Sequence, residues 1–141
     1  MQGQASVFIA APPESVYSLV SDVTRMGEWS PECTHCEWVE GATGPAVGSK
    51  FKGTNKLGPY KWSTTPTVTE AKPGRLFEFD AGATTWRYEF APADGGTQVT
   101  ESFVVTSRAT KVYSSFLFGR VNKMTKGMLT TLERIKAVAE G

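Results

Sequence analysis

The sequence of 141 residues has little of what marks several common classes of protein. Two cysteines and a single histidine exclude a disulfide framework. The 15 Lys and Arg and 14 Asp and Glu give a net charge of +1, which argues against nucleic acid as a partner. No run approaches the roughly 18 apolar residues of a membrane span, and residues 1–6 lack the features of a signal peptide. We therefore expect one soluble, cytoplasmic domain over residues 1–141, without integral membrane association.

The two cysteines, Cys33 and Cys36, lie in the segment Glu-Cys-Thr-His-Cys-Glu. Their spacing is that of thioredoxin-like redox motifs, but such motifs open a helix, whereas residues 37–41 are typical of a strand that ends in a turn. His35 suggests zinc, yet a structural zinc site needs four ligands, and no second pair exists. We interpret both cysteines as strand residues and predict neither a metal nor a cofactor. A thiol-based sensor remains as an alternative.

The distribution of glycine and proline predicts a sheet made of short strands. Residues 4–10 are typical of a first strand, and a short helix over residues 14–22 follows Pro12 and Pro13. A second short turn leads to Trp29. Between residues 34 and 106, clusters of Gly and Pro separate stretches of about 7 to 12 residues, which indicates six further strands. Short connections require antiparallel neighbours, so we expect a sheet of about seven antiparallel strands.

Alternation places aromatic side chains together on one face of this sheet. Trp86 and Tyr88 share one side, and Arg87 takes the other. The same pattern assigns four more aromatic residues to the inner face: Phe51, Trp62, Phe77 and Phe79. Glu101 falls on this face, next to Phe103 along the strand. A buried carboxyl is costly, so it needs a partner, plausibly an inward Arg or Lys, or contact with water or ligand, unless a β-bulge turns it outward.

The last strong pattern predicts a helix over residues 112–139. Its apolar side chains recur in steps of three and four: Leu117, Val121, Met124, Met128, Leu132, Ile135 and Val138. Because one helix does not fill the concave side of a twisted sheet, we expect a cleft between the two. The predicted ligand-binding residues are Trp29, Phe51, Trp62, Phe77, Phe79, Trp86, Tyr88, Glu101, Phe103, Met124 and Met128. The alternative is that these side chains interlock and close the core.

Several segments resemble a known family. Residues 7–22, followed by Trp29-Ser30-Pro31, are similar to the start of the polyketide cyclase/dehydrase group of the START-related (SRPBCC) superfamily. Residues 85–90 and 95–102 are similar to its last hairpin, and residues 132–137 suit its closing helix. The resemblance implies an α+β helix-grip fold, in which a curved antiparallel sheet grips a long C-terminal helix around a hydrophobic cavity. The family has no universal catalytic motif, so the resemblance assigns no catalytic residue.

Two functions follow as expectations. The first is binding of a small hydrophobic molecule, lipid-like, polyketide or aromatic, by a monomer or weak homodimer. The second is an enzyme of the polyketide aromatase/cyclase or dehydratase type acting in the same cavity. That chemistry needs a positioned acid or base, for which Glu101 is the weak candidate.

Overall fold

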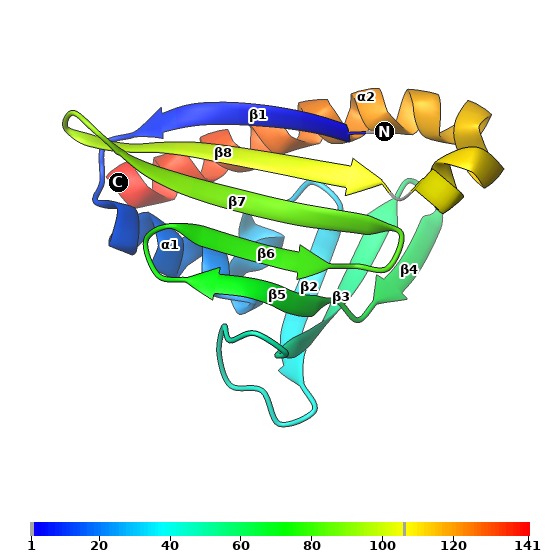
Figure 1. Ribbon diagram of the computed structural model, residues 1–141, viewed down its shortest axis with the longest axis horizontal. Helices are drawn as coiled ribbons and strands as arrows, with labels where there is room; N and C mark the ends of the chain where they lie inside the picture. The colour runs from blue at the N-terminus through cyan, green and yellow to red at the C-terminus, as the bar shows by residue number, and fades with distance from the viewer. Residues whose placement is uncertain (1, 106) are drawn as a thin grey trace.

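The computed structural model describes the backbone of residues 2–105 and 107–141, and the side chains of these residues outside 107–121. Figure 1 shows the arrangement of the elements. In chain order they are β1 (Gln2–Ile9), α1 (Pro13–Ser21), the 3-10 helix η1 (Val23–Glu28), β2 (Cys33–Val39), β3 (Lys50–Leu57), β4 (Tyr60–Thr64), β5 (Thr67–Lys72), β6 (Leu76–Asp80), β7 (Thr84–Ala93), β8 (Gly96–Val105) and α2 (Ser107–Glu140).

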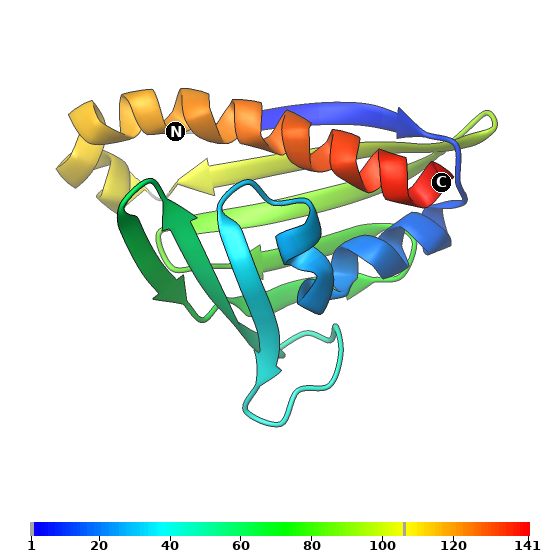
Figure 2. The same cartoon turned by 180° about the vertical axis from the view of Figure 1, so that it is seen from behind.

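The strands of the described residues form one antiparallel sheet. Its continuous path has the order β1-β8-β7-β6-β5-β3-β2, and β4 pairs with β3 beside this path. The stretch 60–68 therefore contributes to two strands, β4 and β5, which are separated at Thr65 and Pro66. The sheet curves, and α2 lies along one of its faces, as the view from behind in Figure 2 shows. The predicted α+β helix-grip architecture is confirmed.

The inner face of the sheet follows the predicted alternation. Phe77 and Phe79 of β6 are buried, and so are Tyr88 and Phe90 of β7. On β8, buried residues alternate with more exposed ones. The buried residues are Thr97, Val99, Glu101, Phe103 and Val105. On β6, β7 and β8, period-two alternation thus separates the more buried side chains from the more exposed ones.

The apolar stripe of α2 is confirmed in its central part. Met128, Leu132 and Ile135 are at most 1% exposed. Val138, predicted to continue the stripe, is instead 41% exposed, and Ala139 packs against the core. The step of four from Ile135 to Ala139 keeps the last turn on the buried side. Leu117 and Val121 lie outside the described side chains.

The end of α2 is fastened to the end of β1. The carboxylate of Glu140 accepts hydrogen bonds from the backbone N–H of Ala10 and from Nζ of Lys136, both at 2.8 Å. Lys136 Nζ also donates to the backbone carbonyl of Phe8 at 2.7 Å. These contacts hold the first strand and the last helix together. None of the helices in the described part of the chain is long and apolar enough to cross a membrane.

Candidate functional site

A partly enclosed cavity of about 360 Å³ lies between the sheet and α2. Its buried inner wall includes Cys33, Cys36, Phe51, Phe79, Tyr88, Glu101 and Met128. Its rim includes the less buried residues Pro31, Trp62, Ala83, Trp86 and Met124. The core is therefore not closed by interlocking side chains, and of the residues predicted to bind a ligand, the structure brings Phe51, Trp62, Phe79, Trp86, Tyr88, Glu101, Met124 and Met128 to one cavity.

Three predicted residues are buried but are not among those that line the cavity. Phe77 packs edge-on against Tyr17 of α1, with ring centroids 6.4 Å apart. The Phe103 ring fills the space over Gly3, where an added Cβ would approach it to 2.8 Å. Trp29 lies under the Arg25 guanidinium, and its carbonyl accepts a hydrogen bond from Arg134. Trp29, Phe77 and Phe103 thus have core contacts. For the strand residues Phe77 and Phe103, alternation gives the face of the strand but not the neighbour that covers it.

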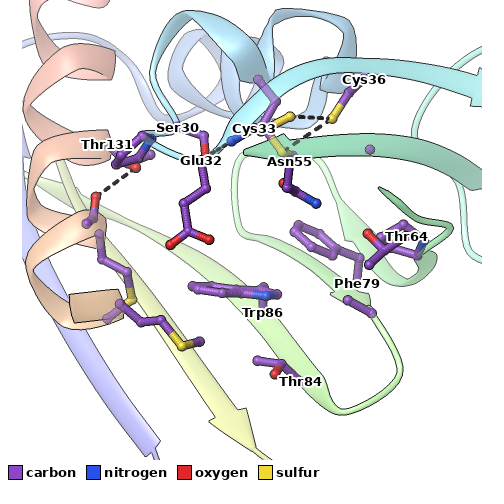
Figure 3. Close-up of a pocket in the computed structure, with 18 of the residues that line it drawn as sticks. Ser30, Glu32, Cys33, Cys36, Asn55, Thr64, Phe79, Thr84, Trp86 and Thr131 are labelled. Carbon is purple, nitrogen blue, oxygen red and sulfur yellow. Dashed lines mark hydrogen bonds between the residues drawn. The ribbon is translucent and has the colours of Figure 1, made fainter. Parts of the chain in front are cut away.

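Polar residues that sequence reasoning missed also line the cavity. They are Ser30, Glu32, Asn55, Thr64, Thr84 and Thr131. Glu32 extends its carboxylate into the cavity from the start of β2 (Figure 3). The Thr131 hydroxyl donates to the Gly127 carbonyl of its own helix at 2.9 Å. Three of these polar residues carried a signal in the sequence. Alternation places Asn55, Thr64 and Thr84 on the same faces as Phe51, Trp62 and Trp86.

Glu101 and Tyr88 form the polar centre of the inner wall. They are cross-strand partners of β8 and β7, in a register without a bulge, so Glu101 is not turned outward. The Tyr88 hydroxyl is hydrogen-bonded to the Glu101 carboxyl. Among the described residues, Oε1 of Glu101 has no hydrogen-bond partner. The predicted inward Arg or Lys is therefore replaced by a phenol on one side and the cavity on the other.

Burial controls the ionisation of this pair. It raises the pKa of Glu101 from 4.5 to about 8, against a smaller lowering by the Tyr88 hydrogen bond. Burial also raises the pKa of Tyr88, and the Glu101 carboxyl adds to this effect. Both groups are consequently neutral near pH 7. A neutral carboxyl carries a proton that it can donate to a ligand oxygen.

Cys33 and Cys36 face the cavity together. In a regular strand, residues three apart point to opposite faces, but β2 has a bulge between Cys33 and His35, so Cys33 pairs with Asn55 and Cys36 with Gly53. Their Sγ atoms are 2.9 Å apart, and Cys36 Sγ lies 3.7 Å from Sδ of Met26. The interpretation of both cysteines as strand residues is confirmed, while their place in the cavity wall was not predicted.

The two thiols differ in acidity. The hydrogen bond with Cys36 lowers the pKa of Cys33, and the backbone of His35 adds to this, against the opposing effect of burial. The same hydrogen bond and burial raise the pKa of Cys36. Cys33 is thus the thiol that ionises first. The side chain of His35 is 68% exposed, and its Nε2 lies 4.0 Å from Oε2 of Glu37. The described residues contain no cluster of three His, Cys, Asp or Glu side chains that could hold a metal ion.

Known proteins resemble the chain over most of its length. A polyketide cyclase-like protein of Corynebacterium glutamicum is 33% identical, with a TM-score of 0.64 over 99% of this chain and 88% of its own. The di-domain ARO/CYC protein BexL of the BE-7585A biosynthetic pathway is 20% identical, with a TM-score of 0.74 over 100% of this chain and 50% of its own. At that identity the likeness concerns the fold.

An uncharacterized protein of Mycobacterium tuberculosis is 33% identical over 100 residues, which are 70% of this chain and 45% of that protein. The chain thus spans less than half the length of this relative. The model of the family described as polyketide cyclase/dehydrase and lipid transport matches residues 2–140. The helix-grip fold and this match agree, and the chain belongs to that family.

Proposed function

We propose that the protein binds a small hydrophobic molecule in the cavity between the sheet and α2. The observation that carries this proposal is the cavity of about 360 Å³ with an inner wall made largely of aromatic, methionine and thiol side chains. That volume is near the lower end of the range of about 300–1,000 Å³ typical of small-molecule sites. The guest would accordingly be compact rather than a long-chain lipid.

The chemistry of the wall narrows the class of guest. Trp86, Phe79 and Tyr88 offer aromatic surfaces, and Met124 and Met128 are flexible side chains that adapt to different shapes. Oε1 of Glu101, which has no hydrogen-bond partner among the described residues, supplies a polar contact in the buried part of the cavity. An apolar or aromatic molecule with one hydroxyl or carbonyl group would satisfy both features, because an unpaired buried carboxyl oxygen is costly.

Partly filling the cavity should weaken binding without disturbing the fold. Thr64 lines the cavity, whereas its neighbour Ser63 is exposed and lies on the other face of β4. Thr64→Trp should weaken binding of the neutral fluorophore N-phenyl-1-naphthylamine about tenfold or more, equivalent to about 1.4 kcal/mol. Ser63→Trp should leave the affinity unchanged. Fluorescence titration measures both.

Two results would contradict this proposal. One is an absence of saturable probe binding to the wild-type protein. The other is the same loss of affinity in both tryptophan variants, since that would place the probe outside the cavity. Native mass spectrometry of protein purified without detergent would then identify any co-purified molecule by its added mass.

The second candidate is a cyclase or dehydratase, and the neutral Glu101–Tyr88 pair favours it. A protonated carboxyl in the buried wall of a cavity is suited to general acid catalysis on a ketone or hydroxyl group. A synthetic polyketone would be offered as substrate. Ring closure, which leaves the mass unchanged, would be followed by chromatographic retention, and loss of water by mass spectrometry. Glu101→Gln keeps the shape but has no acidic proton, so full turnover by this variant would remove the proposed role.

A further inference from the structure

Two sulfur atoms in the wall of the cavity are close enough to react with each other. Cys33 Sγ and Cys36 Sγ lie 2.9 Å apart, and a dashed line joins them in Figure 3. A disulfide bond is about 2.05 Å long. The sulfurs therefore need to approach by only about 0.9 Å. Both belong to the same strand, β2, and its bulge brings the two side chains to the same side.

These thiols are reached through the cavity. Cys33 is 6% and Cys36 2% exposed, and both line the inner wall together with apolar side chains. An oxidant must enter this apolar space to touch the sulfurs, and a strongly hydrated oxidant loses its hydration on entry. The position of the dithiol thus favours oxidants that are themselves apolar.

We infer that Cys33 and Cys36 form a reducing dithiol that converts hydroperoxides of small apolar molecules to alcohols inside the cavity. This inference rests on the proposed function, because the substrate is a guest of the same cavity. It adds an activity to binding, because the bound hydroperoxide is reduced to an alcohol and the dithiol of the protein is oxidised to a disulfide.

The reaction balances in two steps. The Cys33 thiolate attacks the terminal oxygen of the hydroperoxide, the O–O bond breaks, and the alcohol forms while Cys33 becomes a sulfenic acid. The Cys36 thiol then attacks the Cys33 sulfur, the S–S bond forms, and water leaves. In sum, one hydroperoxide and two thiols give one alcohol, one water and one disulfide. The sulfurs lose the two electrons that the peroxide oxygens gain.

Hydrogen bonding and burial give the two cysteines different roles in the reaction, one as nucleophile and one as resolving thiol. The hydrogen bond with Cys36 favours the thiolate of Cys33, which is the nucleophilic form. Cys36 holds its proton more tightly, so it serves as the resolving thiol. The departing alkoxide needs a proton, and the neutral Glu101–Tyr88 pair lines the same cavity and can supply it. Renewed turnover requires a dithiol reductant, which an assay supplies as dithiothreitol.

The experiment compares an apolar oxidant with a small hydrated one on the full chain. Reduced protein is mixed with cumene hydroperoxide or hydrogen peroxide, and loss of thiols and gain of the disulfide are followed by intact mass. We expect at least tenfold faster disulfide formation with cumene hydroperoxide, together with release of one equivalent of cumyl alcohol. Thr64→Trp should slow the reaction of cumene hydroperoxide more than that of hydrogen peroxide, and Ser63→Trp should change neither.

Single substitutions test the two roles. Cys36→Ser should accumulate a sulfenic acid at Cys33 that dimedone traps, and Cys33→Ser should react at least tenfold more slowly. Thiols that stay unoxidised, equal rates with both oxidants, or a fully reactive Cys33→Ser variant would each overturn the inference. If the fluorophore still binds while the thiols stay unoxidised, the dithiol inference fails and the binding proposal stands. If the fluorophore does not bind and both oxidants act equally, both fail.

Discussion

Replacing Glu101 with glutamine should remove a large loss of stability that the wild-type protein undergoes as pH rises from about 4.5 to about 8. In the folded protein, burial raises the pKa of Glu101 from 4.5 to about 8. The unfolded chain releases its proton near pH 4.5, whereas the folded chain retains it. The free energy of unfolding therefore falls with rising pH through this window and levels off above it.

The size of this effect follows from the two pKa values. One pKa unit corresponds to about 1.36 kcal/mol, so a rise from 4.5 to about 8 gives on the order of 5 kcal/mol. Glu101→Gln keeps the shape of the side chain and carries no charge at any of these pH values. The variant should accordingly resemble the wild type near pH 4.5 and exceed it in stability by several kcal/mol at pH 9.

Urea unfolding of both proteins across this pH range measures the difference. Glu133→Gln removes an exposed carboxyl from α2 and controls for the loss of one acidic charge. Parallel stability curves for the wild type and Glu101→Gln would show that Glu101 ionises in the folded protein as it does in the unfolded chain. That result would also remove the basis for Glu101 as a proton donor in the cavity.

Gly96→Ala should destabilise the protein by roughly 3 kcal/mol or more. A Cβ at Gly96 would overlap the carbonyl oxygen of Ile9, and it would lie 2.9 Å from Cα of Ala10. These are backbone atoms at the end of β1, and the neighbouring Thr97 pairs with Ile9 and donates its hydroxyl to the Ala11 carbonyl at 2.7 Å. Backbone atoms cannot move aside by a rotamer change as a side chain can. The pairing of β1 with β8 therefore has to shift to make room for the added Cβ.

Gly44→Ala is the matched control for this substitution. Its φ is not positive, and an added Cβ would meet no atom within 4 Å. The free energy of unfolding of this control, measured in urea, should therefore lie within about 0.5 kcal/mol of the wild-type value. A Gly96→Ala variant that is equally stable would mean that β1 and β8 approach each other less closely at this point than the structure shows.

The inner face of β7 and β8 was predictable because these two strands pair in a regular register. Tyr88 and Glu101 face inward simply because they share the alternation of Phe90 and Val99, and no long-range information was needed. Cys33 and Cys36 are the opposite case. Regular alternation separates them to opposite faces, and only the bulge at Thr34 brings both to the cavity. Where a strand bulges depends on its neighbour, β3, and local residue type did not reveal it.

The division between core and cavity was the other property that the sequence concealed. Phe77 and Phe79 have the same type, strand and face, yet Phe79 lines the cavity while Phe77 packs against Tyr17 of α1. What separates them is the position of α1 over the sheet, which is set by packing between distant segments. Phe103 is likewise buried by a distant segment, because it lies over Gly3 of β1, whereas Trp86 lines the cavity.

The fastening of the first strand to the last helix has a consequence for synthesis. Gln2 pairs with Val104, and Glu140 binds the backbone of Ala10, so partners from opposite ends of the chain must meet. During synthesis on the ribosome, β1 has no strand to pair with until β8 is made. The aromatic face of the sheet stays uncovered until α2 is made as well. Contacts this distant in sequence slow folding, and unburied apolar surface invites aggregation. The nascent chain should therefore be a client of chaperones that shield such surfaces until translation ends.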